Sequence, residues 1–190
     1  MTAAEPLALP GFESLVAPAP SSPAAARADL PSDLGALERM VAECRKCGLC
    51  ETRTQTVFAD GTASARLVFV GEAPGRDEDL KGLPFVGRAG QLLDKMIAAI
   101  QLRRDEVYIC NVLKCRPPDN RTPLPEEVER CTPYLARQLE LIRPALICAL
   151  GLSAAQTLLR TKASMAALRG RMFEYEGIPL IPTYHPAALL

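Results

Sequence analysis

The feature that most constrains the fold is an alternation of short apolar runs with longer amphipathic stretches from residue 67 onward. The apolar run at 67–70 is short and continuous, which is typical of a strand buried on both faces, and 107–113, 145–150 and 178–183 are expected to form further strands. The intervening stretches carry apolar residues at helical spacing. Buried strands that alternate with amphipathic helices build a parallel sheet covered on both sides, so we predict an α/β fold, a three-layer α/β/α sandwich with a central parallel sheet. The expected helices cover residues 89–101, 125–142 and 152–160.

The N-terminal segment differs in composition from the rest of the chain. Residues 1–31 are rich in Ala, Pro and Ser, and such a segment buries too little apolar surface to offset its ordering entropy. We therefore predict a disordered tail over 1–31, with no identified partner, and a single domain over 32–190. Ser32 or Asp33 is a candidate N-cap for a first helix that runs towards Cys44.

Charge and hydropathy narrow the classes of partner. The 190-residue chain has a formal net charge of zero, but residues 1–43 hold six acidic and two basic side chains, and residues 44–190 hold sixteen acidic and twenty basic ones. The small excess of basic residues over 44–190 is compatible with binding to the phosphate backbone of a nucleic acid, but it does not by itself predict such binding. No apolar run is long enough to span a membrane, and the N-terminus lacks the layout of a signal peptide. We therefore expect a cytoplasmic protein with no membrane partner.

Polar residues follow directly on several of the expected strands. The turn at Gly71, the amide Asn111 and the only histidine, His185, each come where a strand pattern ends. The carboxyl ends of parallel strands meet at one edge of a sheet, which is where ligands bind in such folds. A lone histidine is more often structural, and Asn111 alone could simply cap a loop. The functional alternative is that the Gly71 turn, Asn111 and His185 converge at this edge of the sheet and form a binding site.

The cysteines form a second group of candidate functional residues. Seven is an odd number, so a complete disulfide framework is not expected, and in a reducing cytosol clustered cysteines suggest metal or redox chemistry. Two pairs supply four thiolates, which suit either a cubane iron–sulfur cluster or structural zinc. Cys50 could replace one ligand because it repeats the spacing of the first pair. The pairs are Cys44 with Cys47 and Cys115 with Cys131, while Cys110 and Cys148 lie in apolar strand patterns and are expected in the core.

Several long motifs resemble those of one enzyme family. The turn Gly71-Glu72-Ala73-Pro74-Gly75 and the segment 82–90, which includes Pro84-Phe85-Val86, resemble the first motif of the family 4 (iron–sulfur) uracil-DNA glycosylases. The likeness continues through 111–118 and 120–121 and ends in His185-Pro186-Ala187-Ala188-Leu189. It covers roughly residues 40–190.

The resemblance implies a fold, an activity and a cofactor. It implies a uracil-DNA glycosylase-like fold and an enzyme that hydrolyses the N-glycosidic bond of uracil in single- or double-stranded DNA, initiating base excision repair. We expect a monomer. Family members continue after the last motif with a basic residue and a further helix, so we expect the C-terminal helix to be truncated at Leu190. The implied [4Fe-4S] ligands are Cys44, Cys47, Cys115 and Cys131.

The resemblance also assigns roles within the pocket. The Asn111 amide is expected to donate to uracil O4 and accept from N3–H, a pattern that cytosine reverses. Phe85 is expected to stack on the flipped ring, although plain core packing would explain it equally well. His185 is expected to stabilise the departing uracil anion. The turn that contains Gly71, Ala73 and Gly75 is expected to contribute backbone N–H groups.

The residue that activates water is less certain from the sequence. Ala73 stands where the best-known uracil glycosylases carry a water-activating Asp. Glu78 is the first candidate and Glu72 the second, and the alternative is that Glu78 belongs to a solvated acidic run. The expected DNA contacts are Arg116 and Arg121 beside the groove and Leu189 as a wedge into the base stack.

Three other functions compete with this interpretation. The first is a non-catalytic or replication-associated iron–sulfur relative with the same fold. The second is a redox-sensing DNA-binding module, and the third is a relative with an altered base range, including a subtype that traps DNA covalently.

Overall fold

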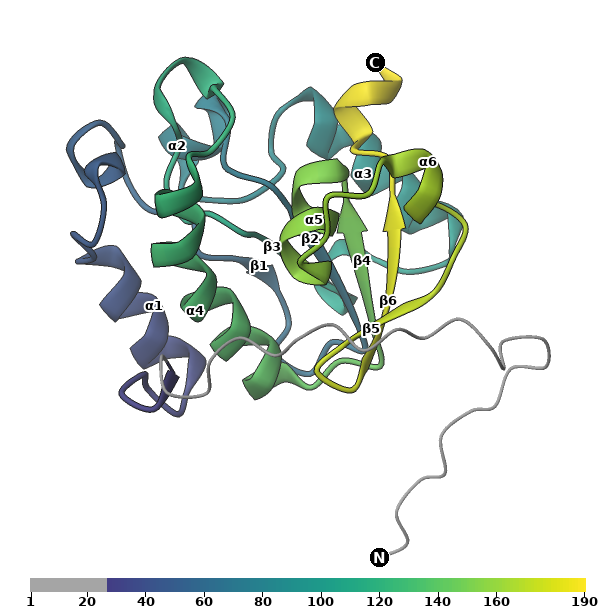
Figure 1. Cartoon of the computed structure of the whole chain (residues 1–190), viewed down its shortest axis with the longest axis horizontal. Coiled ribbons are helices and arrows are strands. Elements are labelled where there is room, and N and C mark those ends of the chain that lie inside the picture. The colour runs from purple at the N-terminus through teal and green to yellow at the C-terminus, as the bar shows by residue number, and fades with distance from the viewer. Residues whose placement is uncertain (1–26) are drawn as a thin grey trace, which may run out of the picture.

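The computed structural model describes residues 27–190, and its centre is a six-stranded sheet with the order β1-β3-β2-β4-β6-β5 (Figure 1). The four inner strands are parallel and the two edge strands pair antiparallel to their neighbours. The predicted central parallel sheet is therefore confirmed. The strands are β1 (Asp60–Gly61), β2 (Leu67–Gly71), β3 (Tyr108–Asn111), β4 (Leu146–Leu150), β5 (Phe173–Tyr175) and β6 (Ile178–Thr183).

Helices cover both faces of the sheet. The α-helices are α1 (Leu34–Ala42), α2 (Arg76–Lys81), α3 (Arg88–Ala99), α4 (Pro125–Ile142), α5 (Leu152–Leu159) and α6 (Met165–Leu168). Short 3₁₀ turns are η2 (Gly48–Glu51), η3 (Arg104–Glu106), η4 (Pro118–Asn120) and η5 (Pro186–Leu189).

Side-chain alternation along the strands builds two core layers. Val68 and Val70 of β2 belong to the larger core, which contains apolar residues of α4, α5 and α6. Phe69 lies between them in sequence, points to the opposite face and packs with Leu93 and Ile97 of α3. Successive side chains of a strand point to opposite faces, so one apolar run fills both layers. The predicted three-layer sandwich follows from this pattern.

The N-terminal part of the domain is longer than the sequence predicted. Asp33 caps α1, since its carboxylate accepts from the Ala36 amide at 2.8 Å. Residues 27–31, which we assigned to the tail, instead pack on the domain. Leu30 is buried with residues of α1 and α4, and Arg27 forms a salt bridge to Glu176 at 2.7 Å. The rest of the predicted tail, residues 1–26, lies outside the described residues.

The remaining element boundaries bear directly on the site. The sequence predicted α4 and β6 with the bounds that the structure has. Strand β3 ends at Asn111, but the next two amides still bind the end of β2 and the residue after it: Val112 N–H donates to the Gly71 carbonyl and Leu113 N–H to the Glu72 carbonyl. These bonds align the two segments that carry most of the pocket. Within the described residues, no helix has the length and apolarity that crossing a membrane requires.

Candidate active site and cysteine cluster

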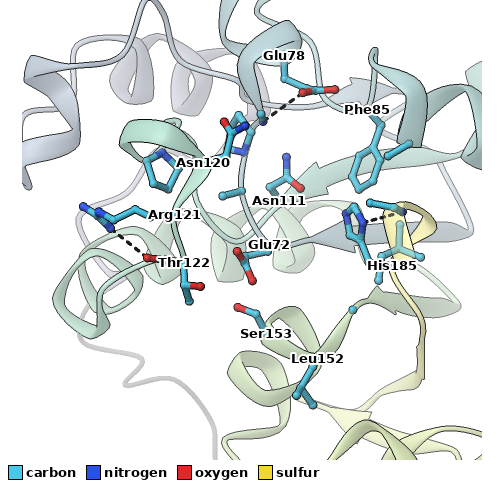
Figure 2. Close-up of a pocket in the computed structure, with 18 of the residues that line it drawn as sticks. Glu72, Glu78, Phe85, Asn111, Asn120, Arg121, Thr122, Leu152, Ser153 and His185 are labelled. Atoms are coloured by element: carbon cyan, nitrogen blue, oxygen red, sulfur yellow. Dashed lines mark hydrogen bonds between the residues drawn. The ribbon is translucent and has the colours of Figure 1, made fainter. Parts of the chain in front are cut away.

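A cavity of about 690 Å³ opens at the carboxyl edge of the sheet, where β2, β3, β4 and β6 all end (Figure 2). The predicted convergence of strand-end residues is therefore observed. Figure 2 shows Phe85 and His185 on one side of this pocket, and Asn120 and Arg121 on the opposite side. The pocket is lined by eight residues singled out from the sequence: Glu72, Ala73, Gly75, Glu78, Phe85, Asn111, Arg121 and His185.

Asn111 presents an unsatisfied polar atom to this pocket. The residue is 2% exposed, and its Oδ1 forms no hydrogen bond within residues 27–190. Gly71 pairs with Asn111 across the β2–β3 ladder, and a Cβ at Gly71 would overlap this oxygen. A buried acceptor without a partner costs free energy unless a ligand supplies the donor. Asn111 is therefore suited to bind an N–H group of a ligand.

Phe85 is held in an unusual backbone conformation. Its φ of 52° lies in the left-handed region, which is rare for an aromatic residue, and the side chain is 5% exposed. The Arg104 guanidinium donates to the carbonyls of Pro84 at 2.6 Å and Phe85 at 3.2 Å. Arg104 is in turn anchored by Asp60 and Asp94. The sequence analysis missed Arg104, which no strand-end position or motif distinguishes.

His185 is oriented by stacking and by one hydrogen bond. Its ring stacks on Phe85 with centroids 5.5 Å apart, and its Nδ1 accepts from the Ala187 amide at 3.1 Å. Burial lowers the pKa of His185 below its ordinary value of 6.5, although the charges of Glu72 and Glu78 act in the opposite direction. The neutral ring with an acceptor at Nδ1 carries its proton on Nε2. His185 therefore has one N–H left to donate.

The two candidate carboxylates have different surroundings. Glu78 accepts from three backbone amides: Gly75 at 3.1 Å, Val86 at 2.9 Å and Gly87 at 3.0 Å. Its carboxylate thus joins the Gly-rich turn to the segment that follows Phe85. The Glu72 carboxylate lines the same pocket and accepts no hydrogen bond from any described residue. Glu72 is consequently the carboxylate that is free to bind water.

The acidic run at 77–79 is only partly solvated. Asp77 is exposed, but Asp79 is 3% exposed and accepts twice from the Thr54 amide, at 2.9 and 3.1 Å. Together with the bonds of Glu78, this shows that the run fastens helix α2 to its neighbours. The interpretation as a solvated surface therefore holds for Asp77 alone.

The predicted DNA-contact residues lie at the rim of the pocket. Arg116 donates to Asn120 Oδ1 at 2.6 Å, and Arg121 forms a two-pronged ion pair with the buried Glu127 at 2.6 and 2.9 Å. That pair lowers the pKa of Glu127 and partly neutralises Arg121. Leu189 is 60% exposed in η5, next to the pocket residue Ala187 in the same turn.

Four further polar lining residues were not selected from the sequence: Asn120, Thr122, Ser153 and Gln156. Ser153 and Gln156 lie in the first turns of α5, after Gly151, whose φ is 95°. A Gly at the end of the β4 pattern was a usable signal, because strand ends at this edge carry the site. Asn120 belongs to a motif noted in the sequence, but nothing there distinguished its role.

The predicted cluster ligands surround a separate small cavity. It is lined by Cys44, Cys47, Cys115 and Cys131, and also by Cys50. Within the described residues, no three Cys, His, Asp or Glu side chains are arranged to bind a single metal ion. An iron–sulfur cubane requires four thiolates around a common volume, and the donor set here fits that chemistry.

Hydrogen-bond donors surround these sulfur atoms. Arg53 donates to Cys115 Sγ at 3.1 Å, the Lys114 amide to Cys131 Sγ at 3.3 Å, and Tyr134 Oη to Cys44 Sγ at 3.4 Å. Such outer donors are typical of thiolates that bind a metal centre. No donor to Cys50 Sγ is found among the described residues.

Burial makes the free thiols weak acids. It raises the pKa of Cys115 and Cys47, and that of Cys131 to about 12. A metal centre reverses this preference, because only the thiolate binds it. Cys110 and Cys148 lie in the sheet as expected, and burial raises the pKa of Cys148 to about 12.

Lys114 lies between the pocket and the cysteines. Its side chain is 1% exposed, and its Nζ donates to the Asn111 carbonyl at 2.7 Å. The same residue donates through its amide to Cys131. One buried residue therefore contacts both the strand end that carries Asn111 and a predicted cluster ligand.

Comparisons with known proteins give a consistent result. The family model of the uracil DNA glycosylase superfamily matches residues 58–190. The chain is 53% identical to a type-4 uracil-DNA glycosylase of Archaeoglobus fulgidus over 160 residues, which cover 80% of each chain. It is 47% identical to the type-4 enzyme of Thermotoga maritima, covering 79% of each chain. It is 43% identical to that of Sulfurisphaera tokodaii, covering 81% of this chain and 74% of the relative.

Proposed function

The chain belongs to the uracil-DNA glycosylase superfamily, in its type 4 group, and we infer from that membership that it is a DNA glycosylase that removes uracil from DNA. This identification favours the catalytic interpretation over a non-catalytic relative. The observation that best supports a base-binding pocket is the buried Oδ1 of Asn111, which has no partner within residues 27–190 and lies beside the Phe85 and His185 rings.

We propose that Asn111 reads the edge of a flipped uracil. A base inside a duplex is unreachable, so it must leave the stack to enter a pocket of this depth. Asn111 Oδ1 would accept from uracil N3–H, while its amide nitrogen donates to O4. Cytosine has an acceptor at N3 and a donor at C4, so both groups of Asn111 would remain unpaired. Phe85 would supply the stacking face, at roughly 1–3 kcal/mol.

His185 is proposed to stabilise the leaving base. Cleavage of the glycosidic bond develops negative charge on the uracil, and a donor near O2 stabilises that charge more than the neutral ground state. The tautomer fixed by Ala187 leaves Nε2–H as this donor. The lowered pKa of His185 supports a neutral ring in this role.

Glu72 is proposed to orient the attacking water. Of the two candidate carboxylates, it alone has both oxygens free of backbone donors in the described part of the chain. Glu78 is then a positioning residue, which holds the turn at Gly75 against the segment at 86–87. This reverses the order of preference that the sequence suggested.

Cys44, Cys47, Cys115 and Cys131 are proposed to hold a [4Fe-4S] cluster. When bound, the cluster would supply a structural cross-link between the segment after α1, the loop after β3 and helix α4. Arg53 and the Lys114 amide would then donate to its thiolates. The protein is expected to act as a monomer on uracil in single- or double-stranded DNA.

Release of uracil from synthetic DNA tests the function. Purified protein is incubated with oligonucleotides that contain uracil or, as a control, thymine or cytosine at one position. We expect free uracil and alkali-labile strands only from the uracil substrate. Absence of free uracil from protein that retains its cluster and its thermal transition would refute the proposal.

A further inference from the structure

A second cavity adjoins the active-site pocket on the face of the sheet that α4 and α5 cover. Its volume is about 1120 Å³. Gln156 lines both cavities, and Thr122 of the first directly precedes Pro123 of the second. Figure 1 shows α4 and α5 side by side, both starting at the carboxyl edge of the sheet. We call this cavity the α4–α5 groove; it continues from the pocket.

The α4–α5 groove concentrates positive charge in a chain that is neutral overall. Four basic residues and one acidic residue, Glu129, line it. All four basic residues are exposed and form no salt bridge with any residue from 27 to 190. Arg104 and Arg121, in contrast, are paired with carboxylates. The four basic residues are Lys46, Arg130, Arg160 and Lys162.

The loop that carries two of these cations is held in place. Arg160 ends α5 with a φ of 48°, and the next amide, that of Thr161, donates to the Gln156 carbonyl at 3.1 Å. Gln156 Nε2 donates to the Ala163 carbonyl at 3.0 Å, and the Ala163 amide donates to Thr161 Oγ1 at 3.1 Å. Arg160 and Lys162 therefore project from a loop that is ordered before any partner binds.

The part of the groove that adjoins the cysteine cavity, where Lys46 and Arg130 line both, is also ordered. The Lys46 ammonium lies 4.8 Å from the centroid of the Tyr134 ring, in a cation–π contact. Arg130 lies on the same helix as Tyr134. Cations from three separate segments thus line one groove: the segment after α1, helix α4, and the end of α5 with its following loop.

We propose that the α4–α5 groove binds the phosphate backbone of the uracil-bearing strand beyond the flipped nucleotide. This inference rests on the proposed function. Unpaired Arg and Lys side chains next to Thr hydroxyls are the donors that contact phosphates, and such contacts position a strand without reading its sequence. The groove adjoins the pocket, so a strand whose base occupies the pocket can extend into it.

A charge-neutral triple variant tests this proposal. Arg130→Gln, Arg160→Gln and Lys162→Gln are combined, and the matched control combines Arg39→Gln, Lys95→Gln and Arg143→Gln. The control residues are exposed, form no salt bridge with the described residues and lie outside both cavities, and Arg143 ends α4 in the same left-handed conformation in which Arg160 ends α5. Both variants have the same net charge, so a general electrostatic effect appears equally in each.

Binding to single-stranded DNA without uracil is measured at several salt concentrations. A plot of log affinity against log salt concentration has a negative slope, and each lost phosphate contact reduces the magnitude of that slope by about 0.7. The slope of the groove variant should therefore be smaller in magnitude than that of the wild type by about 2. The control should keep the wild-type slope. Equal slopes for the two variants overturn the proposal. So does a groove variant with normal DNA binding but weakened binding of polyglutamate, which would indicate an acidic protein partner.

Excision provides the second measurement. A short uracil oligonucleotide that fills only the pocket should be processed equally by wild type, groove variant and control. Oligonucleotides extended on one side of the uracil should be processed faster by wild type and control, and this advantage should be absent in the groove variant. If wild type releases no uracil from any substrate, the proposed function fails, whereas the salt slopes still decide the groove.

Discussion

Gly71 and Asn111 are partners across the β2–β3 ladder, and the Asn111 side-chain oxygen occupies the space that a side chain on Gly71 would need. The same absent Cβ would lie 2.6 Å from Cζ of Phe85. The residue proposed to read the base and the ring proposed to stack on it therefore both depend on a hydrogen atom at position 71.

Gly71→Ala should disable the pocket while the fold persists. The added methyl group displaces the Asn111 amide and the Phe85 ring together, so the single-turnover excision rate should fall by about 10²-fold, the scale of losing one well-placed transition-state group. Gly75→Ala is a useful comparison, because its Cβ would meet only the Glu78 carboxylate, at 2.8 Å. A Gly71→Ala enzyme with normal rate and selectivity would show that Asn111 and Phe85 lie elsewhere when DNA binds.

Asn111→Asp should change which base is selected. A carboxylate only accepts hydrogen bonds, so it loses the donor to uracil O4 and suits the exocyclic amine of cytosine. We expect a lower rate on uracil and a measurable rate on cytosine, assayed by release of each base from matched oligonucleotides. Asn111→Ala is the control and should lose uracil excision without gaining cytosine. Unaltered selectivity in both variants would make Asn111 a purely structural residue.

The carboxylates should separate into a catalytic and a positioning residue. Glu78→Ala removes three backbone hydrogen bonds and should lower the unfolding free energy by about 1–3 kcal/mol, together with the rate. Glu72→Gln should lower the rate and leave the denaturant midpoint within error of the wild type. If Glu72→Gln is fully active and Glu78→Gln is stable but inactive, the roles are the reverse of those proposed.

His185→Ala should affect chemistry more than binding. The single-turnover rate is expected to fall by roughly 10²-fold or more, whereas affinity for a non-cleavable uracil duplex should change much less. The donor acts on charge that develops after binding, which is why the two constants should diverge. Equal losses in affinity and rate would remove His185 from the catalytic residues.

The pH dependence of stability gives an independent measure of His185. Burial lowers its pKa in the folded state, so the unfolded chain takes up the proton at higher pH. Wild type should therefore lose stability as pH falls through the ordinary value of 6.5. Protonation of Nδ1 also removes the bond from the Ala187 amide. His185→Gln should lack this component, as measured by urea midpoints on both sides of that pH.

The cysteine cavity predicts which thiols are required. Anaerobically purified protein should be brown and contain iron and sulfide, and Ala at Cys44, Cys47, Cys115 or Cys131 should remove the colour and lower solubility. Cys50→Ala should keep the colour, since no hydrogen-bond donor to its sulfur is found within residues 27–190. Stoichiometric zinc without iron or sulfide in fresh protein would exclude the cluster.

Sequence patterns were most informative where one physical signal dominates. Helix α4 has long helical periodicity between a starting Pro and the Pro that follows it, and its bounds were predicted correctly. The strand ends at Gly71, Asn111 and the segment before His185 located the pocket for the same reason. Edge strands β1 and β5 are two and three residues long, too short for any period to appear.

Other features depend on contacts between distant residues. Arg104 donates hydrogen bonds to the carbonyls of Pro84 and Phe85, which lie twenty and nineteen positions earlier in the chain. No local sequence pattern predicts such a contact. The engagement of Glu78 by three amides likewise became visible only when the turn and the following segment were brought together. Leu30 falls within the Ala/Pro/Ser-rich segment that was predicted to be a disordered tail, yet tertiary packing buries it.

The position of Lys114 has a consequence for how the enzyme would fail. Its Nζ donates to the carbonyl of Asn111 and its amide donates to Cys131, so loss of the proposed cluster would disturb the residue proposed to read the base. Displacement of Asn111 would lower uracil excision, so loss of the cluster and loss of activity should occur together.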